Sequence, residues 1–123
     1  MHTAQPHTPT RPAAQRIAYA ALAAALLAAA IARIETDGGA WQFFVFGAAP
    51  DLALFLGAGR DLAPGQLHPR AVPVYNAAHR FIGPVVLALA TGYDVGALAW
   101  ALHIAIDRAV GYGLRTSDGF QRP

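Results

Sequence analysis

The sequence predicts an all-α protein, a four-helix transmembrane bundle with short loops and a disordered N-terminal tail. Hydrophobic residues make up 55% of the 123 residues and charged residues only 13%, whereas soluble proteins carry about 25% charged residues. The apolar residues gather in four runs, each close to the length of about 20 residues that a spanning helix needs. The polar stretches between the runs are short, which favours tight turns between neighbouring helices.

The chain divides into a tail, a membrane domain and a short end. Residues 1–15 are rich in proline and hold almost nothing to bury, which predicts a disordered cytoplasmic tail. Residues 16–115 form the predicted membrane domain, and residues 116–123 form a short C-terminal tail. The predicted spans cover about 17–34, 41–59, 72–90 and 95–114.

The first apolar run is also similar to a secretory signal sequence. Arg11 and Arg16 precede it, and Ala-Ile-Ala at residues 30–32 is similar to a cleavage site for signal peptidase. The apolar run continues through Ile34, however, and three further runs follow. We therefore expect the first run to be retained as a span.

The distribution of arginine predicts the orientation in the membrane. With four spans, one side of the membrane receives Arg11, Arg16, Arg60, Arg70, Arg115 and Arg122. Only Arg33 lies near the other side, so the positive-inside rule places both termini in the cytoplasm. The expected partners are the lipid bilayer and a second copy of the chain. A nucleic-acid partner is not expected, because the net charge is only +2 and no basic stripe alternates with aromatic residues.

Polar side chains recur at similar depths within three of the predicted spans. They are Asp51 in the second, Tyr75, Asn76 and His79 in the third, and His103 and Asp107 in the fourth. Residues three or four apart share one face of a helix. A carboxylate at the middle of a membrane helix costs at least about 2.5 to 3.5 kcal/mol on insertion scales, so such a group is by default a candidate functional site. We expect one shared site near the cytoplasmic leaflet.

The first hypothesis for this site is metal binding. Zinc accepts neutral imidazole and carboxylate ligands, so His79, His103 and Asp107 are candidate ligands, with Asp51 as a fourth ligand or a general base. Three protein ligands leave one position for water, which is the arrangement used in metal-assisted hydrolysis. The sequence has no cysteine, so thiolate ligands and disulfides are excluded. The sequence leaves the cofactor unknown, with a divalent metal such as zinc as the candidate.

Four further residues are candidates for a role in catalysis. Tyr75 and Asn76 can orient a substrate or donate a hydrogen bond to it. Arg80 directly follows His79, and Arg108 directly follows Asp107. An arginine holds a phosphate through paired donors. If the protein is an enzyme, we therefore expect a metal-dependent membrane hydrolase that acts on a lipid headgroup ester or phosphodiester.

Two other classes of function remain open. Asp51, Asp107, Arg80 and Arg108 sum to zero charge, so they can neutralise one another as buried ion pairs in a structural cluster of a membrane assembly. Alternatively, Asp107 and the histidines can relay protons, which would require an oligomer because four spans leave little room for a pathway.

Three motifs resemble a known family. They are APDLALFLG with Asp51, YNAAH with His79, and LHIAIDRAVGYGL with His103 and Asp107. Together they resemble the small bacterial membrane proteins of domain of unknown function family 4260, over about residues 16–120. The resemblance implies a multi-span protein of the bacterial inner membrane and no established activity. Members usually carry threonine after the histidine of YNAAH and a different ending, whereas this chain has Arg80 and ends in Gln121, Arg122 and Pro123.

A second, shorter similarity points to membrane-bound metal-dependent hydrolases. Their PD, HR and HxxxD elements recur here in the same order, as Pro50 with Asp51, His79 with Arg80, and His103 with Asp107. This resemblance implies the same metal ligands as the first hypothesis.

Overall fold

The computed structural model describes residues 11–122, in which the regular secondary structure is helical and no strand is present. The elements are α1 (Ala13–Asp37), α2 (Ala40–Ala48), η1 (Ala49–Leu52), α3 (Ala53–Leu56), η2 (Pro69–Ala71), α4 (Val72–Ala78), α5 (Ile82–Thr91) and α6 (Asp94–Ala109). The predicted all-α class is confirmed. Most of the predicted tail, residues 1–10, lies outside the described residues, and α1 already begins at Ala13.

Helix α1 contains the first predicted span. Its 25 residues rise about 37 Å at 1.5 Å per residue, and it is the one helix within residues 11–122 that is long and apolar enough to cross a membrane. Apolar helices near the N-terminus are common to membrane anchors and signal sequences. Gly38 and Gly39 follow α1 with φ of 75° and 83°, a conformation that glycine adopts without strain, and turn the chain into α2.

The second apolar run is a broken helix rather than one continuous span. Helix α2 gives way to the 3-10 turn η1, and α3 ends at Leu56. Pro50 lies in η1, has no N–H group, and its ring clashes with the carbonyl four residues earlier. The interruption therefore follows from Pro50.

The third run is also broken, between α4 and α5. Pro84 is the reason, because its ring cannot sit over the carbonyl of Arg80 in a regular helix. The fourth run is one helix, α6, but it ends five residues before the predicted boundary at Leu114. Gly111 follows its end with φ of 104°, the left-handed conformation that commonly terminates a helix.

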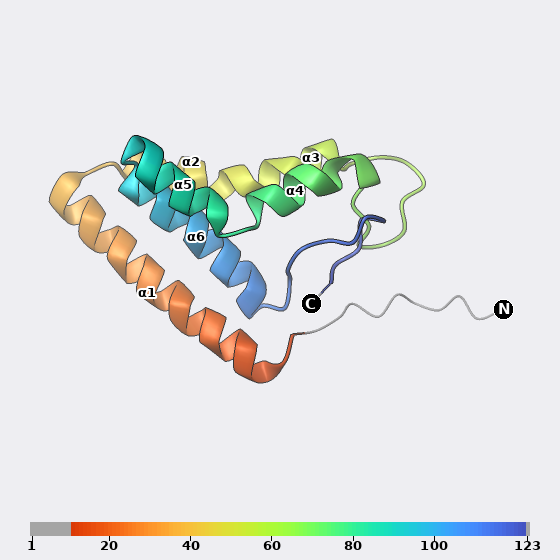
Figure 1. Ribbon diagram of the computed structural model, residues 1–123, viewed down its shortest axis with the longest axis horizontal. Helices are drawn as coiled ribbons and strands as arrows, with labels where there is room; N and C mark the ends of the chain where they lie inside the picture. Colours follow the sequence, from red (N-terminus) through yellow and green to blue (C-terminus); the bar gives the residue numbers. More distant parts are fainter. Residues whose placement is uncertain (1–10, 123) are drawn as a thin grey trace.

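Helix α6 is the centre of the molecule and packs against α1, α2 and α5 (Figure 1). Its buried residues are Val95, Gly96, Ala97, Ala99, Leu102, Ile104 and Ala105. Small residues along this helix let the neighbouring helices approach closely. Because His103 and Asp107 lie on α6, packing against this helix brings residues of the other helices close to them.

Two side chains of α6 donate hydrogen bonds to backbone carbonyls at the break between α4 and α5. Trp100 Nε1 donates to the carbonyl of Ala78 at 2.7 Å, and Arg108 Nη2 donates to the carbonyl of His79 at 3.4 Å. These carbonyls end α4 and lack a regular helical partner. The contacts hold the end of α4 against α6.

The surface of the described chain is strongly apolar. Many large hydrophobic side chains are exposed, including Phe44 (72%), Phe55 (80%) and Leu89 (84%). Others are Ile17, Trp41, Val45, Leu52, Leu56, Val74, Ile82, Val85, Val86 and Val110. Apolar surface of this extent is unusual for a soluble monomer and marks a region that contacts protein or membrane.

The close packing of α2 on α6 gives a testable prediction. A Cβ at Gly96 would overlap the ring of Phe46, whereas a Cβ at Gly47 would meet only Ala99 Cβ at 3.9 Å. Gly96→Ala is therefore expected to lower the free energy of unfolding by about 1 to 3 kcal/mol, as overpacking does. Gly47→Ala is the matched control and is expected to be neutral or stabilising. Thermal unfolding in detergent measures both, and equal effects of the two substitutions would contradict this packing.

Candidate metal centre

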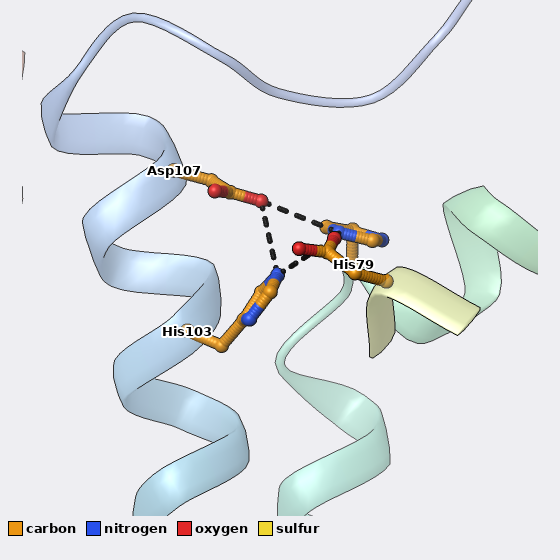
Figure 2. A group of neighbouring side chains, drawn as sticks. His79, His103 and Asp107 are labelled. Atoms are coloured by element: carbon orange, nitrogen blue, oxygen red, sulfur yellow. Dashed lines mark hydrogen bonds and ion pairs between the residues drawn. The ribbon is translucent and has the colours of Figure 1, made fainter. Parts of the chain in front are cut away.

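Three separate elements bring four of the predicted residues together. Asp51 comes from η1, His79 from the end of α4, and His103 and Asp107 from α6. One ligand atom of each residue lies within 4.8 Å of the corresponding atoms of the other three. We call these residues the four-residue cluster; Figure 2 labels three of them.

Within the cluster, each carboxylate contacts both imidazoles. His103 Nε2 lies 3.1 Å from Asp51 Oδ1 and 3.3 Å from Asp107 Oδ2. His79 Nε2 lies 3.4 Å from Asp51 Oδ1 and 3.3 Å from Asp107 Oδ2. Acids and imidazoles therefore alternate, and both histidines use Nε2, as the dashed lines in Figure 2 show for the contacts with Asp107.

The other nitrogen of each histidine is held by the backbone. His79 Nδ1 lies 2.7 Å from the carbonyl oxygen of Tyr75, and His103 Nδ1 lies 2.8 Å from that of Gly47. A carbonyl only accepts, so Nδ1 is the donor in both histidines, and in a neutral ring Nε2 then carries the free lone pair. In both histidines Nε2 faces the carboxylates, as a lone pair when the ring is neutral and as a donor when it is protonated. Metal-binding histidines are oriented in the same way by a donor bond from the second nitrogen.

Local breaks in the helices create these contacts. Pro50 cannot donate to the preceding turn, and the carbonyl of Gly47 in that turn accepts from His103 instead. His79 ends α4 with φ of −103° and ψ of 19°, so its ring folds back over the last helical turn onto Tyr75. The same prolines that interrupt the apolar runs therefore place the site.

The cluster is closed on one side and open on the other. His79 is only 2% exposed, and its Nε2 is buried without a hydrogen-bond partner. The side chain of Asp51 is 47% exposed, the most of the four. A buried polar atom without a partner calls for an explanation, such as an ion that it binds.

Tyr75 and Asn76 support the cluster and do not face it. The Tyr75 ring stacks on His79 with 3.9 Å between ring centroids, and its hydroxyl accepts from Gln121 Nε2 at 3.3 Å. Asn76 Nδ2 donates to the carbonyl of Arg115 at 2.9 Å, and Asn76 Oδ1 accepts from the N–H of the same residue at 2.7 Å. Both side chains thus face the C-terminal segment.

The two arginines also lie outside the cluster. Arg80 is exposed, and Arg108 donates to the Tyr19 hydroxyl at 3.0 Å while lying 4.8 Å from the ring centroid of Phe81. Neither forms an ion pair with Asp51 or Asp107 within residues 11–122. The expected pairing of arginines with these carboxylates is absent, because the guanidinium of Arg108 is taken by aromatic and backbone partners.

Sequence reasoning missed three supporting groups: the Gly47 carbonyl, Trp100 and Arg115. Trp100 had a usable signal, because it lies three residues before His103 on the same face of a helix. Arg115 had none, since its contact with Asn76 joins positions far apart in the chain.

Comparison with known protein families identifies the family of this chain. The family described as "Domain of unknown function (DUF4260)" matches residues 14–123, nearly the whole chain. The chain belongs to the DUF4260 family. The resemblance found in the sequence is thereby confirmed. No curated protein and no solved structure matches this DUF4260 protein, so the similarity to metal-dependent hydrolases stays a prediction.

Proposed function

We propose that this DUF4260 protein is a membrane-embedded metalloprotein whose four-residue cluster binds one divalent metal ion, with zinc as the first candidate. One observation carries the proposal. Both Nδ1 atoms are committed to carbonyls, so two imidazole lone pairs and two carboxylate oxygens converge within 4.8 Å. Four acceptors at such distances repel one another unless a cation lies between them.

The contact distances are compatible with a bound metal ion. Zinc binds nitrogen and oxygen at about 2.0 to 2.2 Å, so adjacent ligands of a tetrahedral site lie about 3.4 Å apart. The four contacts between imidazole and carboxylate measure 3.1 to 3.4 Å, while the remaining ligand-atom separations extend to 4.8 Å, so a tetrahedral ion would draw the two farther atoms together. A charged N–H donor and a carboxylate usually approach to about 2.7 to 2.9 Å, which is closer than any of these contacts.

The charge balance supports the same proposal. Two carboxylates and two neutral imidazoles carry a charge of −2, which a divalent cation cancels. A neutral centre is much less costly to hold among apolar helices than unpaired carboxylates are. The predicted ligands are therefore Asp51, His79, His103 and Asp107.

Membrane embedding rests on α1 and on the apolar surface. Helix α1 is long enough to span, and exposed side chains such as Phe55 and Leu89 suit contact with lipid. We propose that α2–α3 and α4–α5 cross as broken helices, with both termini cytoplasmic. Non-helical backbone is tolerated at membrane depth where it is buried in protein, and both breaks lie at the four-residue cluster.

The chemistry that best fits such a site is hydrolysis of a lipid-like substrate. A divalent ion supplies Lewis-acid chemistry, and the half-exposed Asp51 is the ligand or general base nearest the open side. An apolar groove of about 300 Å³ between α2 and α6 has His103 in its wall together with Phe43, Phe44, Gly47, Ala48, Ala99, Leu102 and Ile106. This groove suits an alkyl chain held beside the cluster.

Metal analysis of the protein purified in mild detergent, with any affinity tag removed, tests the proposal. We expect about one equivalent of metal in the wild type and loss of that metal in His103→Ala and Asp107→Ala, because each substitution removes a ligand. His68→Ala and Asp61→Asn are matched controls outside the cluster and are expected to keep the metal. A folded wild type that takes up no zinc, iron or manganese would overturn the metal proposal.

A further inference from the structure

The segment that follows α6 folds back against the support of His79. Residues 113–121, called here the C-terminal hairpin, are closed by a bridge between Arg115 and Gln121 and by the bond from Thr116 N–H to the Phe120 carbonyl at 2.8 Å. The sequence alone predicts a short tail over residues 116–123. The hairpin instead contacts α4 through side chains and backbone.

Arg115 and His79 lie on the ring of Tyr75. The Arg115 guanidinium carbon lies 4.8 Å from the Tyr75 ring centroid, and the His79 ring is stacked on Tyr75 at 3.9 Å with 15° between the planes. A cation over an aromatic ring is attracted to its face. The contacts fix the position of the ring, and the ring in turn limits rotation of the His79 imidazole.

A second set of bonds holds the hairpin itself. Asn76 binds both the N–H and the carbonyl of Arg115, and Arg115 Nη1 donates to the carbonyls of Gly65 and Gly119 at 3.0 and 2.8 Å. The N–H of Leu67 donates to the Gly119 carbonyl at 2.9 Å, and a Cβ at Gly119 would overlap the Leu67 backbone. The hairpin is therefore tied to the loop before α4 as well as to α4.

We infer that Arg115 is a positioning residue for the metal ligand His79 and acts on it through Tyr75. The inference rests on the proposed metal function. Residues that orient a metal-binding histidine from outside the ligand set typically contribute 10- to 100-fold to metal affinity. Loss of Arg115 is therefore expected to weaken binding by about this factor.

Zinc affinity, measured by competition with a chromophoric chelator, tests this role, and the visible spectrum of the cobalt(II) form reports ligand geometry. Arg115→Ala and Asn76→Ala are expected to weaken zinc binding by about 10- to 100-fold and to change the cobalt spectrum in the same way. Arg115→Lys keeps a cation over Tyr75 and is expected to recover part of the affinity. Arg60 is an exposed arginine in the loop before α4, which the hairpin contacts. Arg60→Ala is therefore the control, with unchanged affinity expected.

The outcomes separate the two proposals. If the wild type binds zinc and the Arg115 and Asn76 variants bind it with equal affinity and an equal cobalt spectrum, the positioning role is wrong and the metal site stands. If the folded wild type binds no metal, the proposed function and this role fail together. If Arg115→Ala does not fold, zinc affinity and the cobalt spectrum are compared in Gln121→Ala instead. This substitution removes only the contact to the Tyr75 hydroxyl, so a smaller loss of affinity is expected.

Discussion

Stripping the metal with a chelator is expected to lower the unfolding temperature of the wild-type protein, and adding zinc back is expected to restore it. A ligand that binds only the folded state stabilises it by about 4 kcal/mol when its free concentration is 1,000 times Kd. The effect should be large here because removal of the cation leaves two carboxylates and two lone pairs facing one another at 3.1 to 3.4 Å.

The variant His103→Ala supplies the control for this experiment. It lacks one ligand, so its unfolding temperature is expected to respond little to chelator or zinc. Differential scanning fluorimetry in detergent measures all four states. An equal response of wild type and variant would show that zinc acts elsewhere on the chain, and no response in either would contradict metal binding.

The second large effect is expected from pH. Histidine ligands must be neutral to bind a metal, and histidine side chains ordinarily titrate near pH 6.5. Acidification of the metal-loaded protein from pH 8 to pH 5 is therefore expected to release the metal and to lower stability. Dialysis at each pH followed by metal analysis gives the release curve, and unfolding at the same pH values gives the stability.

A structural cluster of protonated histidines predicts the opposite sign. Protonated imidazoles paired with Asp51 and Asp107 would bind protons more tightly in the folded than in the unfolded state. Stability would then be greatest at low pH, as long as the carboxylates stay ionised, and would fall as pH rises. Increasing stability between pH 8 and pH 5 without bound metal would favour this alternative.

The fold was predictable where apolar patterning alone decides it. An all-helical chain and a long first helix follow from the composition and from the uninterrupted run that became α1. The breaks in the second and third runs were not predicted as breaks, although Pro50 and Pro84 were visible. A proline in an apolar run can kink a helix or end it, and the packing against α6 determines which of the two occurs.

The four residues of the cluster were predictable from the sequence, but most of the groups that hold them in place were not. Asp51, His79, His103 and Asp107 stood out because titratable groups are rare in apolar runs, and the structure brings them together. The same rarity drew attention to Arg80 and Arg108, which lie outside the cluster. The contact of Arg115 has no signature in the sequence, since it joins distant positions. The Gly47 carbonyl has an indirect one in Pro50, which cannot donate to the preceding turn.

The order of the ligands along the chain has a consequence for biosynthesis. His103 and Asp107 both lie on α6, which leaves the ribosome after every helix that it packs against. A nascent chain that ends before α6 offers one carboxylate and one imidazole, too few for a stable complex. If the cluster binds a metal as proposed, loading has to wait until α6 has emerged, and cells starved of the ion during expression are expected to accumulate an apoprotein that can still be charged afterwards.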